Sequence, residues 1–117
     1  MTSLREVKKQ IESDSKNWLV WLMDFVDDFR YHKDPAAVVE PFELTNEKVD
    51  AVLASVAEYL CDELNIECPE WLLKVPACKV PWFISGMENL KAIAIVESPL
   101  HFRIRKIFVL ENFLSRV

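Results

Sequence analysis

The most regular pattern of apolar and polar positions lies in the middle of the chain. Apolar residues recur there at intervals of three and four, which places them on one broad face of an α-helix. The residues of this face are Val49, Val52, Leu53, Val56, Ala57, Leu60, Cys61 and Leu64. Thr45 stands before the segment and has a side chain that can cap a helix. We predict a helix that begins at Thr45 and buries this face, with Glu58 and Asp62 as solvated charges on its exposed side.

The same spacing predicts two helices before it. Ser3 and Glu6 have the spacing of a capping box, so the first helix is predicted to begin at Ser3. A Ser-Asp-Ser sequence at 13–15 separates it from the second helix. The second helix is predicted to end before Pro35, because a residue that precedes proline avoids helical dihedral angles. The two apolar stripes consist of Leu4, Val7 and Ile11 in the first helix and of Trp18, Trp21, Leu22, Phe25, Val26 and Phe29 in the second.

Prolines interrupt the pattern at two places. Residues 34–44 contain two prolines and no helical period, which predicts a linker on the surface. The residues expected to pack this linker onto the body are Val38, Val39 and Phe42. Residues 65–84 contain three prolines and leave room for a single helical turn at 70–74. The remainder of that segment is predicted to be an ordered aromatic loop.

The pattern in the C-terminal third predicts one helix, followed by a second element that can be either a helix or a strand. Ser85 and Glu88 are another capping-box pair, and the helix that they begin is predicted to run to residue 97. Ser98 and the proline after it can start a short helix. The alternation of apolar and basic residues at 102–105 is equally typical of a strand, so both assignments stay open.

Composition narrows the fold class. Hydrophobic residues make up 51% of the 117 residues and charged residues 28%, as in a globular chain. Gly86 is the one glycine, where average usage predicts roughly eight. This shortage excludes glycine-rich phosphate loops and disfavours a hairpin-rich β fold. We therefore predict a single all-α domain over residues 1–117, with four to five helices, a proline and aromatic loop, and room for one short strand near residues 102–109.

Charge is distributed unevenly along the chain. The formal net charge is −5, yet residues 98–117 carry four Lys/Arg and one Asp/Glu, which leaves −8 on residues 1–97. An acidic body disfavours general nucleic-acid binding, because the phosphate charge must meet a positive surface. The basic end can instead contact an acidic partner. We expect its apolar residues to dock on the body and its cations to face outward, namely Arg103, Arg105 and Lys106.

The three cysteines match neither a zinc-binding pattern nor a disulfide framework. Cys61 falls on the predicted core face, and Cys68 and Cys78 flank the proline loop, where they can approach each other. The longest apolar run, at 18–23, has six residues and is too short to span a membrane. These features predict a cytoplasmic protein with no bound cofactor.

One set of polar side chains has the character of metal ligands. Asp24, Asp28 and His32 are spaced four apart and share a face of the second predicted helix. Two carboxylates and an imidazole at this spacing can bind a divalent cation, as a small metal-dependent enzyme would require. The alternative is a solvated acidic face that ends in a histidine near the helix C-terminus. We favour the alternative, because one helix face seldom completes a metal site.

Two tryptophans of the loop, Trp71 and Trp82, complete the candidate partner-binding residues. An aromatic side chain in such a loop either fills the core or joins a binding surface. Together with Arg103, Arg105 and Lys106, they predict contact with another protein, of acidic character. The sequence contains no nucleophile elbow or other catalytic motif, so an enzyme is not the favoured class. Nucleic-acid contact through the basic end is the remaining alternative.

Several segments of the second half resemble a family of small uncharacterised bacterial proteins. They are residues 68–71 (CPEW), 81–83 (PWF), 97–103 (ESPLHFR) and 111–116 (ENFLSR), and the likeness covers roughly residues 55–117. The family has more consecutive arginines after the phenylalanine, where this chain has Ile104. The resemblance implies no catalytic residues. It implies a bacterial regulatory partner, antitoxin-like, of the kind found in toxin–antitoxin or defence gene pairs, some of them beside nucleotidyltransferase-like proteins.

Overall fold

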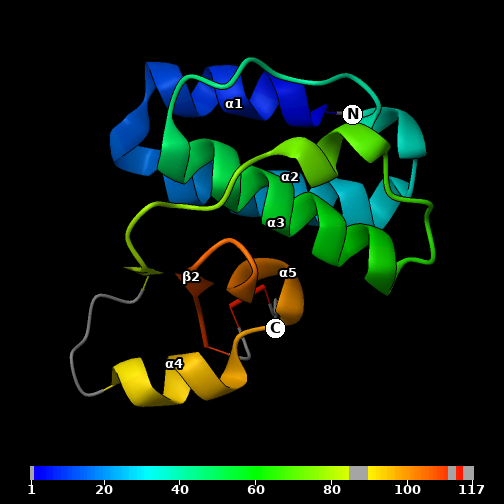
Figure 1. Cartoon of the computed structure of the whole chain (residues 1–117). Helices are drawn as coiled ribbons and strands as arrows, with labels where there is room; N and C mark the ends of the chain where they lie inside the picture. Colours follow the sequence, from blue (N-terminus) through cyan, green and yellow to red (C-terminus); the bar gives the residue numbers. More distant parts are fainter. Residues whose placement is uncertain (1, 85–89, 111–112, 115–117) are drawn as a thin grey trace.

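The computed structural model describes residues 2–84, 90–110 and 113–114. In these ranges the chain forms five α-helices, three short 3₁₀ helices and one two-stranded sheet, so the predicted helical fold is confirmed (Figure 1). The elements are α1 (Leu4–Ser13), η1 (Ser15–Asn17), α2 (Trp18–His32), η2 (Pro35–Val38), α3 (Glu47–Glu63), η3 (Glu70–Lys74), β1 (Trp82–Phe83), α4 (Lys91–Glu97), α5 (Leu100–Arg103) and β2 (Ile107–Phe108). No helix in the described ranges is long and apolar enough to cross a membrane.

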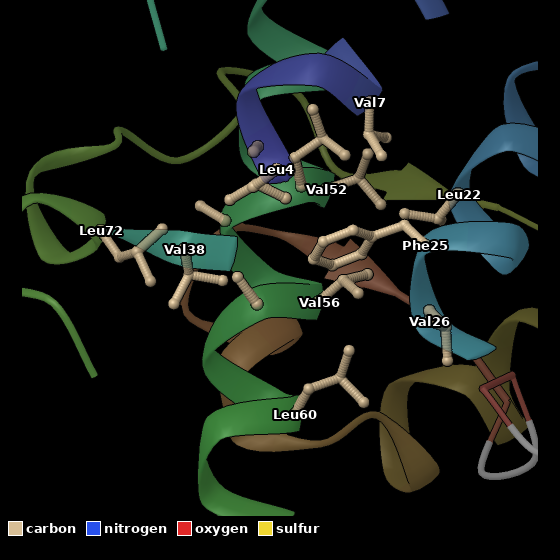
Figure 2. Close-up of a cluster of buried hydrophobic side chains, with 14 of the residues drawn as sticks. Leu4, Val7, Leu22, Phe25, Val26, Val38, Val52, Val56, Leu60 and Leu72 are labelled. Atoms are coloured by element: carbon tan, nitrogen blue, oxygen red, sulfur yellow. The ribbon is translucent and has the colours of Figure 1, made fainter. Parts of the chain in front are cut away.

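The core forms where α1, α2 and α3 pack on one another. Figure 2 shows Leu4 and Val7 of α1 above Val52 and Val56 of α3, with Phe25 of α2 beside them. These side chains belong to the three apolar stripes predicted from the sequence, and each large one contributes about 1.5–3 kcal/mol when it is fully buried. The single helical turn predicted in the proline loop is also confirmed, as η3.

The helix α3 is buried on almost every side, not only on its predicted apolar face. Ala51, Ala54 and Ser55 on its other side are also buried, since small side chains let neighbouring segments approach closely. A charged residue is buried with them. Asp50 pairs with Lys8 of α1, with 2.7 Å between Oδ1 and Nζ, and both side chains are withdrawn from solvent. An unpaired charge would be costly at this buried position, so each of the two side chains requires the other as its counter-charge.

The helix starts follow local capping, with one correction. At α1, the Ser3 hydroxyl oxygen accepts a hydrogen bond from the Glu6 amide (3.2 Å), as predicted. At α3, the cap is Asn46 and the prediction of Thr45 is wrong. The Asn46 backbone is extended, and its side-chain oxygen accepts from the Val49 amide (3.2 Å). Asparagine is a stronger cap than threonine, so the helix begins one residue later.

The linker between α2 and α3 is more structured than the sequence predicted. Its 3₁₀ turn, η2, is capped by Asp34, whose side chain accepts from the Ala36 amide (3.0 Å). Val38 is fully buried and Phe42 nearly so, but Val39 is 57% exposed. The prediction that all three valine and phenylalanine side chains pack inward is therefore wrong for Val39, because successive residues of a turn point in different directions.

A parallel strand pair organises the C-terminal part. β1 pairs with β2, and α4 and α5 lie in the connection between the two strands. The strand predicted near residues 102–109 is confirmed at 107–108. The stretch at 102–105 is helical up to residue 103, because its first two amides both bond to the Pro99 carbonyl (3.1 and 3.0 Å).

Ser98 does not cap the helix that follows it. Its buried hydroxyl accepts a hydrogen bond from the Val109 amide (2.8 Å) and donates to the Ala94 carbonyl (2.5 Å). The side chain thus ties the end of α4 to the segment after β2, which corrects the predicted capping role. The predicted cap at Ser85 and its partner Glu88 lie outside the described residues, and the helix expected to follow them is present as α4.

Candidate functional site

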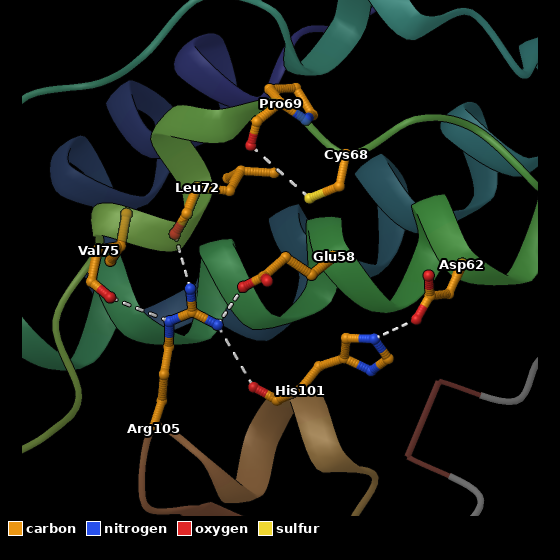
Figure 3. A network of polar contacts seen from close by, with 8 residues as sticks. All are labelled: Glu58, Asp62, Cys68, Pro69, Leu72, Val75, His101 and Arg105. Carbon is orange, nitrogen blue, oxygen red and sulfur yellow. Dashed lines mark hydrogen bonds and ion pairs between the residues drawn. The ribbon is translucent and has the colours of Figure 1, made fainter.

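The three cations of the basic C-terminal end do not share one surface. Arg105 is only 3% exposed, so the prediction that it faces outward is wrong. Its guanidinium forms an ion pair with Glu58 of α3 (Figure 3). It also donates hydrogen bonds to the carbonyls of Leu72 (2.7 Å), Val75 (3.3 Å) and His101 (3.4 Å). A planar group with five donors can satisfy several acceptors at once, which suits arginine to this buried position.

The interpretation of Glu58 as a solvated charge is also wrong, because only 5% of the residue is exposed. The guanidinium of Arg105 is its counter-charge. Asp62, one turn later on α3, is exposed as predicted, and its Oδ2 lies 2.5 Å from Nε2 of His101. The sequence contains one indication that this side of α3 is packed. Ala54, one turn before Glu58, is a small residue that lets a neighbouring segment approach closely. The sequence shows that Arg105 has the charge opposite to that of Glu58, but it does not show that the two side chains pair.

This polar network holds the C-terminal segment against the central helix. Glu58 and Asp62 belong to α3, whereas His101 and Arg105 come from α5 and the turn after it. Figure 3 shows the guanidinium reaching up between α3 and η3. Its charges are matched within the chain, so the network positions the segment and leaves no cation there for a partner.

Arg103 and Lys106 remain at the surface. The Arg103 guanidinium donates to the carbonyls of Ser98 (2.7 Å) and Val96 (3.2 Å), at the C-terminal end of α4. Carbonyls in the last turn of a helix lack helical partners, so this arginine satisfies them without losing its charge. Within the described ranges, neither Arg103 nor Lys106 forms an ion pair with a carboxylate. Both keep their place as candidate contacts for an acidic partner.

The helix α4 exposes most of its apolar side chains to solvent. Ala94 is its only buried residue, whereas Ile93 (46%), Ile95 (48%) and Val96 (76%) are exposed. At 100° per residue, these three side chains and the exposed Ala92 cover about 160° of the helix circumference on the side away from Ala94. Figure 1 shows α4 at the edge of the molecule, distant from the bundle of α1, α2 and α3. We call Ala92, Ile93, Ile95 and Val96 the α4 outer face.

The two tryptophans of the proline loop pack against the body of the protein. The Trp71 ring lies edge-on to Phe42, with 5.2 Å between centroids, and its Nε1–H donates to the Val38 carbonyl (2.9 Å). Trp82 lies against Trp18, with 5.6 Å between ring centroids. Both loop rings are half-buried against the core. Trp71 is thus an anchor of the loop, and Trp82 forms part of a wall that is still open to solvent.

All three cysteines are free thiols, and burial raises the pKa of each one. Cys61 lies in the core as predicted, and burial, followed by the nearby Cys68, raises its pKa to about 12. Cys78 lies near Glu47, at the opposite end of α3 from Cys68, so the approach of Cys68 and Cys78 that the sequence left open does not occur. Thiols held in the protonated form are weak nucleophiles and poor metal ligands.

The candidate metal face on α2 is engaged in local contacts. Asp28 accepts a hydrogen bond from the Thr2 amide (2.7 Å) on one oxygen, and its other oxygen lies 3.1 Å from Nδ1 of His32. Asp24 is exposed and makes none of these contacts. In the part of the chain that the structure describes, no group of three or more His, Cys, Asp or Glu side chains is placed to hold a metal ion. The structure therefore adds no ligand to the pair Asp28 and His32.

Comparison of the chain with protein-family models, with curated protein sequences and with solved structures gave no match.

Proposed function

We propose that this protein is a protein-interaction module that docks a partner on the α4 outer face. The observation that supports the proposal is the exposure of apolar side chains on α4, where Ile93, Ile95 and Val96 are open to solvent and only Ala94 is buried. Isolated apolar side chains are common on protein surfaces, but a contiguous apolar face marks an interaction site. Each of the three would contribute about 25 cal/mol per Å² when a partner covers it.

The charges around α4 indicate the chemistry of that partner. Arg103 lies at the C-terminal end of α4 and Lys106 follows in the next turn, and neither is neutralised by a carboxylate within the described ranges. A partner segment with apolar residues flanked by Asp and Glu would match both features. An amphipathic helix presents such a pattern along one face, so we propose an acidic amphipathic helix of another protein as the occupant.

The alternatives predicted from the sequence have less support. Nucleic-acid contact would need a positive surface, yet Arg105 is buried and the net charge is −5. A metal-dependent enzyme would need more ligands than Asp28 and His32 supply. The narrower antitoxin-like role and the cytoplasmic location stay predictions from the resemblance and the composition.

The test compares two substitutions of the same kind. Val96→Glu places a negative charge in the α4 outer face, where it repels an acidic partner and interrupts the apolar contact. Val80→Glu is the matched control, because Val80 is the same residue type, 72% exposed, and lies in the proline loop. Proteins captured from the native cell by the wild-type chain are identified, expressed and titrated against all three purified proteins. We expect the dissociation constant to rise at least about tenfold for Val96→Glu, which is about 1.4 kcal/mol, and to stay unchanged for Val80→Glu.

Salt dependence gives a second readout on the same complex. Binding should weaken as salt rises, because exposed charges are screened within about 8 Å at physiological ionic strength. Arg103→Gln should reduce this salt dependence without abolishing binding. A captured protein that binds Val96→Glu as tightly as the wild type would contradict the proposal, since the α4 outer face would then be irrelevant to docking.

A further inference from the structure

A small cavity lies between the bundle and the proline loop, on a side of the molecule that the proposed docking on α4 does not use. Its volume is about 190 Å³. Ile11 and Val52 form its inner surface, and both are 1% exposed. Trp18 and Trp82 form its walls, with their rings inclined at 45° to each other. Ser15 and Asn46 also line the cavity, so its surface is mainly apolar and includes two aromatic side chains.

One cation stands at the mouth of this cavity. Lys48 of α3 lines the cavity, is exposed, and places its Nζ 5.5 Å from the centroid of the Trp82 ring. The two acidic residues of the same helical turn are used elsewhere. Glu47 accepts a hydrogen bond from the Lys79 amide (3.0 Å), and Asp50 pairs with the buried Lys8. Among the described residues, no carboxylate forms an ion pair with Lys48.

These features together select a class of ligand. Binding pockets for small molecules are lined mainly by apolar and aromatic side chains, with a few polar groups that set orientation. A cavity of about 150 Å³ can hold a benzene ring, so this one accommodates a single ring with a short substituent. A flat ring would stack against the tryptophans, and an anionic group on the substituent would meet the Lys48 ammonium.

We propose that the cavity lined by Trp18 and Trp82 binds a small aromatic carboxylate, with its ring packed against the two indoles and the carboxylate at Lys48. Phenylacetate is a suitable probe, and phenylacetamide is its uncharged counterpart of the same shape. With about ten non-hydrogen atoms and a partly open site, phenylacetate is expected to bind with a dissociation constant of about 1 mM or below.

The experiment follows the indole N–H signals of the ¹⁵N-labelled protein during titration with each probe. The signals of Trp18 and Trp82 should shift and saturate. The signal of Trp71 is the internal reference, because its N–H is held by the Val38 carbonyl beside another part of the core and should not move. Single Trp→Phe variants assign the signals.

Two variants separate the contributions of charge and shape. Lys48→Met keeps the length of the side chain but removes the charge, and it should weaken phenylacetate binding about three- to tenfold while leaving phenylacetamide unaffected. Val49→Phe fills the cavity from its half-buried rim and should abolish binding of both probes. The absence of a saturable shift at Trp18 and Trp82, shifts that persist in Val49→Phe, or equal affinity of the wild type and Lys48→Met for phenylacetate would each overturn the proposal.

Discussion

Two apolar helices of this protein, α3 and α4, have opposite environments. α3 is surrounded by α1, α2, η3 and α5, and even its charged residues Asp50 and Glu58 are buried. α4 consists almost entirely of alanine, isoleucine and valine between Lys91 and Glu97, yet only Ala94 is buried. The hydrophobicity of a helix therefore does not set its burial. The number of segments that pack around it does.

The difference has a consequence for polar groups. Inside the bundle, a charged side chain must find a counter-charge in the chain, because leaving it unpaired in a buried place is costly. Arg105 meets this requirement for Glu58, and Lys8 meets it for Asp50. The exposed apolar side chains of α4 are in the opposite situation. They gain stability only when another molecule removes them from water.

The largest expected loss of stability comes from breaking the buried ion pair of α3. Arg105→Met keeps much of the side-chain volume but leaves Glu58 buried without its counter-charge, and we expect the free energy of unfolding to fall by about 3–5 kcal/mol. Urea denaturation followed by circular dichroism measures it. Arg103→Met is the control, because Arg103 is an exposed residue with no carboxylate partner among the described residues, and its loss should cost less than about 1 kcal/mol. Equal losses in the two variants would contradict the burial of the Arg105–Glu58 pair.

A comparison of truncations in the two helices should give the next largest effect. Leu60 is fully buried on α3, so Leu60→Ala should lower the free energy of unfolding by about 2–5 kcal/mol. Val96→Ala removes exposed methyl groups from α4 and should change it by less than about 0.5 kcal/mol. The same denaturation curves give both values. A loss below about 1 kcal/mol for Leu60→Ala would mean that α3 is not the centre of the core.

The buried thiol of α3 predicts a smaller effect that depends on pH. Burial raises the pKa of Cys61 from 9.0 to about 12, so the fold favours the protonated thiol. Its contribution to stability is complete below pH 9 and is lost as pH rises from 9 towards 12, by about 1.4 kcal/mol per pH unit at most. Cys61→Ala should therefore show a shallower decline of stability between pH 9 and pH 10.5. Parallel curves for the variant and the wild type would show that Cys61 ionises as freely in the fold as in the unfolded chain.

The sequence by itself was sufficient for the elements whose cause is local. The apolar stripes of the first three helices, the cap at Ser3 and the single turn at η3 follow from residues within four positions of one another. The cap at α3 was one residue off, because Asn46 and Thr45 both have suitable side chains and the backbone conformation decided between them. Local rules also predicted a short strand near the C-terminus, but not its partner.

Only the tertiary structure decided the features that join distant segments. Arg105 reaches the Leu72 carbonyl across 33 positions of sequence, and His101 reaches Asp62 across 39. The cation at Arg105 therefore became part of the core, whereas Arg103, two residues earlier, stayed at the surface. The exposure of α4 and the cavity lined by Trp18 and Trp82 also depend on contacts between distant segments. Helical periodicity states which side chains share a face, but the path of the rest of the chain determines whether that face meets protein or water.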